Sequence, residues 1–135
     1  MKLVYPAVFT PYEKPGDGFV VMFPDLPGCV TGGDTLPEAL FMAEDAASGW
    51  ILTELEEGKD VPSPSPLSSL KCKRNEIINL IPLDMDRYAE KYGSAAVKKT
   101  LTIPAFMNTF VTEHAISCSR LLQDAISQKM IGLSQ

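Results

Sequence analysis

Three side chains in the last third of the chain have the chemistry needed to contact DNA. Lys98, Thr100 and Thr102 alternate with other residues in the stretch 97–104, so an extended strand would place them on one face. A lysine ammonium and two hydroxyls can donate hydrogen bonds to phosphates and to base edges. The spacing therefore predicts a short strand with one polar face suited to nucleic acid.

The other face of this strand is apolar and calls for a partner. Leu101 and Ile103 would point into a core, but a strand this short is not stable alone. Two such strands from two chains form an antiparallel ribbon that fits the major groove, the mode used by the repressors MetJ and Arc. The alternative is a hairpin strand within an ordinary α+β domain.

Two short helical patterns follow the strand. The first begins at Pro104, and the second begins after Ser117, whose hydroxyl can cap the helix. A strand followed by two helices is the order of a ribbon-helix-helix (β-α-α) domain, which we predict for residues 97–135 as a dimerisation and DNA-binding domain. In such domains the second helix start also receives a DNA phosphate, a role compatible with plain capping. The predicted DNA-binding residues are Lys98, Lys99, Thr100, Thr102, Ser117 and Ser119.

The charge of −5 is unevenly distributed along the 135 residues. Residues 1–60 carry three lysines against eleven acidic side chains, a net −8, whereas residues 61–135 carry nine basic and six acidic side chains, a net +3. The acidic half suits a basic partner, and the basic half, doubled in a dimer, suits DNA phosphates. For the acidic half alone, solubility is the competing explanation.

Few residues suggest catalysis, metal binding or export. Cys29, Cys72 and Cys118 are scattered, and the single histidine, His114, lies where the first C-terminal helix should end and cap. We predict neither cofactor, metal nor catalytic residue. The sequence contains no apolar run long enough for a signal peptide or a membrane span, so we expect a cytoplasmic protein without membrane contact.

The N-terminal half has the pattern β-β-β-α-β. Strands are predicted at 3–9, 19–23, 29–31 and 76–81, the last ended by Pro82, and a proline-rich connector occupies 61–66. A capping box of Thr35 and Glu38 starts a helix that ends at Gly58. A short helix at 84–92 leads to Gly93, the expected domain boundary.

The long helix has one wide apolar stripe and one apolar pair outside it. The pair, Phe41 and Leu52, falls on the opposite face beside Asp45 and Ser48, where water is expected. It could anchor a partner, although burial by the connector is the alternative. The stripe that should pack on the sheet consists of Leu36, Ala39, Leu40, Ala43, Ala46, Ala47, Trp50, Ile51 and Leu55.

Two segments of the N-terminal half resemble a known protein family. They are Phe-Pro-Asp-Leu-Pro-Gly-Cys at 23–29 and Thr-Gly-Gly-Asp-Thr-Leu-Pro-Glu-Ala at 31–39. The family that they resemble is the HicB antitoxin family, and the resemblance covers roughly residues 3–82. The proline at position 37 is a mild departure from that pattern. From the residues alone, the prolines and glycines of the loop also indicate a rigid element needed for folding.

The resemblance implies an α+β protein with a partial ribonuclease H-like N-terminal domain at 1–82, a helical linker at 83–96 and the ribbon-helix-helix domain. It implies an antitoxin that masks a HicA-type mRNA-cleaving toxin and represses its own operon, as a homodimer or a tetramer. The predicted toxin-binding residues are Phe41, Asp45 and Leu52.

Two other functions remain open. One is a stand-alone regulator whose N-terminal domain senses a small molecule, and the other is a degenerate nuclease. A two-metal nuclease site requires carboxylates clustered on strands and a helix, and the interiors of the predicted strands carry none. The sequence therefore favours a non-enzyme.

Overall fold

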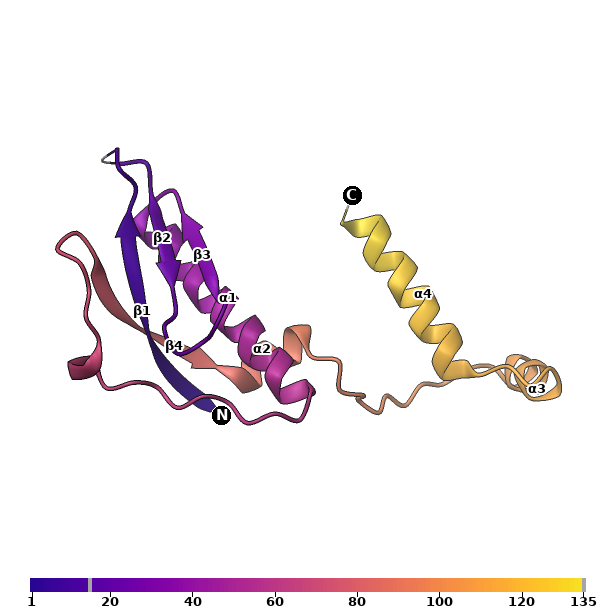
Figure 1. Ribbon diagram of the computed structural model, residues 1–135. Coiled ribbons are helices and arrows are strands. Elements are labelled where there is room, and N and C mark those ends of the chain that lie inside the picture. Colours follow the sequence, from indigo (N-terminus) through magenta and orange to yellow (C-terminus); the bar gives the residue numbers. More distant parts are fainter. Residues whose placement is uncertain (15, 135) are drawn as a thin grey trace. The chain divides into compact units, whose positions relative to one another are not determined.

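A four-stranded antiparallel sheet and a long helix make up most of the first part of the chain (Figure 1). The computed structural model describes residues 1–14 and 16–134. It is an α+β structure that divides into two compact units, residues 1–95 and 96–135. The elements are β1 (Lys2–Pro11), β2 (Phe19–Met22), β3 (Val30–Gly33), α1 (Leu36–Glu56), the 3-10 turn η1 (Leu67–Ser69), β4 (Ile77–Asp84), α2 (Met85–Tyr92), α3 (Ala105–Glu113) and α4 (Cys118–Leu133).

The sheet has the strand order β3-β2-β1-β4, so β1 is central and pairs with both β2 and β4. Val8 lies opposite Met22 of β2 and Ile78 of β4. Alternate side chains of β1, including Tyr5 and Phe9, are fully buried in the core. The predicted order of strands and helix in this unit is confirmed.

The start of α1 follows the predicted capping chemistry with one change. Thr35 Oγ1 accepts a hydrogen bond from the amide of Glu38 at 3.2 Å, as predicted. The carboxylate of Glu38 accepts from the amide of Asp34 at 3.1 Å rather than from that of Thr35. Both bonds occupy amides at the helix start and fix where α1 begins.

Small residues bring α1 close to the sheet. Ala39, Ala43 and Ala47 are fully buried at four-residue spacing, and a Cβ on Gly33 of β3 would lie 2.4 Å from the amide nitrogen of Ala39. This close contact explains why the apolar stripe that we predicted on α1 includes residues that do not pack against the sheet. Leu36 and Leu40 flank the contact and stay exposed, whereas Ser48, predicted to face water, is buried.

Pro82 does not end the last strand, contrary to our prediction. β4 continues through it to Asp84, with Pro82 opposite Val4 of β1. Because β4 is an edge strand, a residue without an amide hydrogen is tolerated there. Asp84 then caps α2 by accepting from the amide of Arg87 at 3.3 Å.

Residues 83–96 do not form a separate linker. α2 belongs to the first unit, where Met85 is buried and Tyr88 packs against the core. The terminal ammonium of Met1 lies 2.7 Å from Asp86, and Glu56 accepts a hydrogen bond from the amide of Ser94 at 3.0 Å. The unit boundary therefore follows Ala95, beyond the end of α2.

The second unit consists of an extended segment, residues 96–104, followed by α3 and α4. Both helices occur where they were predicted, and the Ser117 hydroxyl accepts from the amide of Arg120 at 3.3 Å. In the single chain, the extended segment is not paired into a sheet. A strand there requires a partner, so the predicted ribbon stays a prediction.

Candidate interaction surfaces

The loop between β2 and β3 holds three parts of the first unit together. Asp25 accepts hydrogen bonds from the amide of Ser65, at 2.9 Å, and from its hydroxyl. The indole of Trp50 donates to the carbonyl of Pro27 at 3.1 Å, and Leu26 is fully buried. The loop thus ties the connector and α1 to the sheet, which is the folding role that its prolines indicated.

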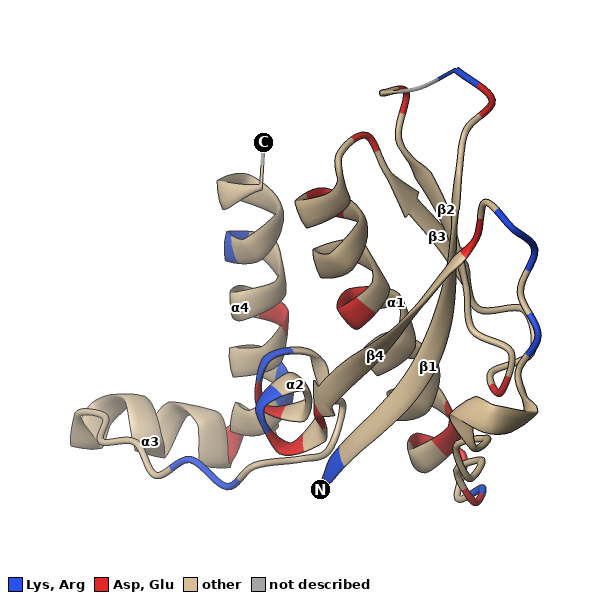
Figure 2. Cartoon of the chain, turned by 90° about the vertical axis from the view of Figure 1, so that its left-hand side faces the viewer, with Lys and Arg blue, Asp and Glu red and all other residues tan. Residues whose placement is uncertain are grey.

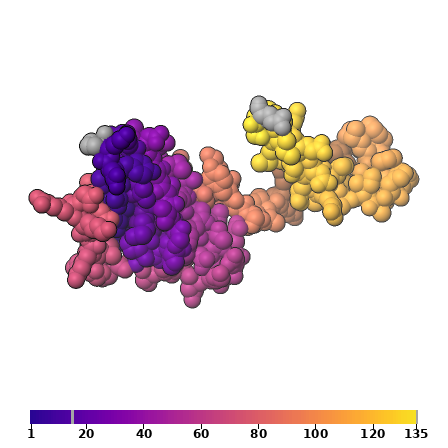
Figure 3. Space-filling model, turned by 45° about the horizontal axis from the view of Figure 1, so that its top comes forward, coloured from indigo at the N-terminus to yellow at the C-terminus, as the bar shows by residue number. Residues whose placement is uncertain are grey.

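The connector from α1 to β4 passes around one end of the sheet to the β4 edge (Figure 1), where it forms a ridge on the surface of this unit (Figure 3). The hydroxyl of Tyr5 donates to the carbonyl of Pro62, which anchors the beginning of the connector. The pKa of Tyr5 is raised, mainly by burial and to a smaller extent by the nearby charge of Asp25. Phe41 stays 73% exposed, so the connector does not bury it.

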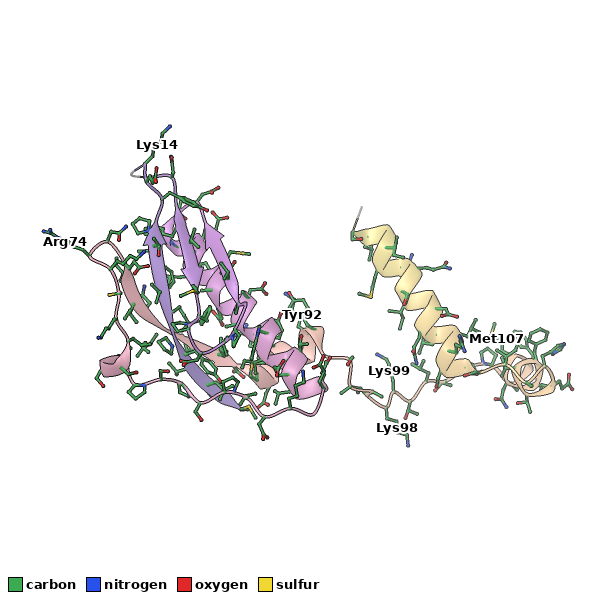
Figure 4. All side chains as sticks on the ribbon, viewed as in Figure 1. Lys14, Arg74, Tyr92, Lys98, Lys99 and Met107 are labelled. Carbon is green, nitrogen blue, oxygen red and sulfur yellow. The ribbon has the colours of Figure 1, made fainter. Side chains whose placement is uncertain are left out.

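A groove of about 360 Å³ lies between α1 and α2, and we call it the α1–α2 groove. Its α1 wall carries Phe41, one of the predicted contact residues, and the end of its α2 wall is Tyr92 (Figure 4). Leu52 is not part of it, because that side chain packs against the core. The lining residues are Phe41, Glu44, Asp45, Ser48, Asp84, Arg87, Tyr88, Lys91 and Tyr92.

Aromatic rings and charges sit on defined walls of this groove. The rings of Tyr88 and Tyr92 have centroids 4.7 Å apart, and the ammonium of Lys91 lies 5.2 Å from the centroid of Tyr92. The pKa of Tyr88 is raised, mainly by burial and to a smaller extent by the charges of Asp45 and Tyr92. The α2 residues of this groove were not predicted, although the four-residue spacing of the two tyrosines could have indicated them.

α1 is the most acidic element of the first unit. It carries five acidic side chains and no basic one, and Figure 2 shows red segments along its visible part. Glu38 caps the helix, Glu54 pairs with Lys59 at 3.9 Å, and Glu56 binds Ser94. Glu44 and Asp45, beside Phe41, make no such bond within the described part of the chain. Two carboxylates are thus available beside an exposed aromatic ring.

The predicted DNA-contacting residues lie on the extended segment and at the start of α4. All of Lys98, Lys99, Thr100 and Thr102 are exposed, and Figure 4 shows Lys98 and Lys99 on opposite sides of the backbone. The alternation expected of a strand is thus present before any pairing. Ser117 and Ser119 are exposed at the first turn of α4.

The apolar side chains of the second unit have little to cover them. Leu101 and Ile103 are 56% and 44% exposed, and no residue of α3 or α4 is buried. A groove of about 590 Å³ runs between the extended segment and the two helices, lined by Lys99, Leu101, Ile103, Met107, Asn108, Val111, Cys118, Ser119, Leu121, Leu122 and Ala125. We call it the ribbon groove.

His114 ends α3 as predicted. Its Nδ1 lies 2.8 Å from the carbonyl of Phe110, and the two rings stack with centroids 4.1 Å apart. Across residues 1–14 and 16–134, no three His, Cys, Asp or Glu side chains are grouped to hold a metal ion. No helix among these residues is both long and apolar enough to cross a membrane.

Comparison with known proteins gives a consistent result. Residues 5–126 match a family model described as HicB_like antitoxin of bacterial toxin-antitoxin system. The chain is 32% identical over 109 residues to an uncharacterized 14.9 kDa protein in the rep-hol intergenic region of Haemophilus phage HP1, covering 76% of this chain and 79% of that protein. It is 30% identical over 113 residues to antitoxin HicB of Escherichia coli K12, covering 84% and 69% respectively.

Among solved structures, a chain of the toxin–antitoxin complex from Streptococcus pneumoniae superimposes with a TM-score of 0.70 at 27% identity. The superposition covers 96% of this chain and 99% of that chain. The family match extends from the first strand into α4 and so takes in both units. This chain therefore belongs to the HicB-like antitoxins of bacterial toxin–antitoxin systems.

Proposed function

We propose that this chain binds and masks a HicA-type mRNA-cleaving toxin with its first unit and represses its own operon with its second. The observation that carries the proposal is the difference in burial and surface charge between the two units. The first has a closed core and an acidic surface, whereas the second exposes apolar and basic side chains that a single chain leaves uncovered.

Toxin binding is supported by charge and by the relatives. An RNA-cleaving toxin needs positive charge to hold phosphates, and residues 1–95 carry eight basic against fifteen acidic side chains. The similar chain from Streptococcus pneumoniae comes from a toxin–antitoxin complex. We assign toxin contact to Phe41 and Asp45, and we leave out Leu52 because it packs against the core.

This function has a direct test with two purified proteins. The 135-residue chain is titrated into the HicA-type toxin proposed as its partner while cleavage of an RNA substrate is followed. We expect cleavage to stop once the antitoxin units equal the toxin molecules. Undiminished cleavage at a tenfold excess of the chain would contradict the proposal.

DNA binding is assigned to a dimer in which two extended segments pair as a ribbon. Pairing would cover Leu101 and Ile103 in the ribbon groove and direct Lys98, Thr100 and Thr102 toward DNA. Lys99, which lines the ribbon groove, and Ser117 and Ser119 would contact phosphates from its edges. In this arrangement the first unit of each subunit would bind one toxin molecule. We propose a partial ribonuclease H-like fold for this unit.

Changing Thr100 and Thr102 to alanine should reduce sequence discrimination more than overall affinity. Hydroxyls that bond base edges distinguish sequences, whereas lysines attract the phosphates of any DNA. Losing both contacts should lower the ratio of operator affinity to random-DNA affinity at least tenfold, because a good base contact contributes roughly 1–3 kcal/mol of discrimination. Gel-shift titrations of both DNAs at one salt concentration measure the ratio, and an unchanged ratio would exclude these threonines from readout.

A further inference from the structure

The α1–α2 groove combines the features of a site for a cationic side chain. Phe41 and Tyr92 stay 73% and 54% exposed on its two walls, and Tyr88 packs beside Tyr92. Aromatic faces attract cations, and they bind the flat guanidinium of arginine especially well. The groove offers such faces without being closed.

The charges of the groove are arranged by wall. Glu44 and Asp45 line the α1 side, whereas Arg87 and Lys91 line the α2 side. Asp84, the N-cap of α2, adds a third carboxylate to the lining. No salt bridge joins the two sides among the residues that the structure describes, so these opposite charges lie farther apart than direct pairing requires. A cation entering the groove would be attracted by the α1 wall and repelled by the basic side chains of α2.

We propose that the α1–α2 groove holds one arginine or lysine side chain of the toxin, with its charge against Asp45 and Glu44 and its stem against Phe41 and Tyr92. This inference rests on the proposed toxin binding and gives that contact a location and a chemistry. The net negative charge of the first unit favours a basic protein as occupant over nucleic acid. A toxin cation held here is no longer free to bind RNA.

The first experiment separates this groove from general attraction between charges. The double variant Glu44→Gln/Asp45→Asn removes two carboxylates from the groove. The matched double variant Glu13→Gln/Asp17→Asn removes two from the exposed turn between β1 and β2, outside the groove. Binding of each 135-residue chain to the catalytically inactivated toxin is measured by calorimetry at one salt concentration.

We expect the groove variant to bind the toxin at least tenfold more weakly and the turn variant to bind within threefold of the unchanged chain. Equal weakening by both variants would mean that the lost affinity comes from long-range attraction between charges, and it would overturn the proposal. If the unchanged chain failed to bind the toxin, the proposed function itself would fail. Wild-type binding by both variants would overturn the groove proposal alone.

The second experiment tests the aromatic wall. Tyr92→Ala should weaken toxin binding about tenfold, and Tyr92→Phe, which keeps the ring, should weaken it less. Leu67→Ala is a matched control, because this side chain is 50% exposed on η1 and does not line the groove. Melting curves of all variants check folding. Equal affinities for the alanine and phenylalanine variants would exclude the proposed contact between the Tyr92 ring and the stem of the toxin side chain.

Discussion

Leu101→Asp is expected to leave the chain monomeric at micromolar concentration and to abolish operator binding. Leu101 lies in the ribbon groove and is 56% exposed in the single chain. In the proposed dimer both copies of this side chain enter one small core. Two unpaired carboxylates buried there would cost about 3–5 kcal/mol, which weakens dimerisation by more than a hundredfold.

DNA binding should be lost together with the dimer. The proposed DNA-reading ribbon consists of one strand from each chain, so a monomer would have no complete reading surface. Light scattering measures the mass, and a gel shift with operator DNA measures binding. Toxin binding should persist, because the core of the first unit contains only its own residues.

Ile131→Asp serves as the control for this prediction. Ile131 belongs to the same unit and is 61% exposed, but it does not line the ribbon groove. The control should keep the mass of the unchanged chain. A dimer formed by Leu101→Asp, or an unchanged chain that is already monomeric, would contradict the ribbon.

Local chemistry made the elements of the first unit predictable, whereas close packing did not. The capping box and the turn residues located α1 and the strands to within a few positions. The width of the buried stripe depended on how closely α1 approaches β3, which the spacing of apolar residues does not reveal. Leu36 and Leu40 were therefore placed inside, although they lie outside.

Sequence periodicity identified two residues on the α1 wall of the α1–α2 groove. Phe41 and Asp45 were predicted because they fall outside the apolar stripe of one helix. Arg87, Tyr88 and Tyr92 reach the groove because α2 folds back onto α1 about forty residues later. A pattern within one helix carries no information about that return, so α2 was mistaken for a linker.

Gly33→Ala is expected to destabilise the first unit more than any exposed substitution. An added Cβ would lie 2.4 Å from the nitrogen and 2.8 Å from the Cα of Ala39. These are backbone atoms of the first turn of α1, which the bonds made by Thr35 and Glu38 hold in place. Relief requires α1 to move off the sheet, so we expect a loss of about 2–4 kcal/mol.

Fluorescence of Trp50 can follow this loss, because Trp50 is the single tryptophan of the chain and bonds the β2–β3 loop. The melting temperature of the first unit should fall by roughly 8–30 °C, given about 4–8 °C per kcal/mol for a unit of this size. Gly132→Ala, whose Cβ meets no atom within 4 Å, should be neutral or stabilising. Melting of Gly33→Ala within 2 °C of the unchanged chain would mean that α1 can shift without cost, and that the close helix–sheet contact does not hold the proposed toxin-binding face in position.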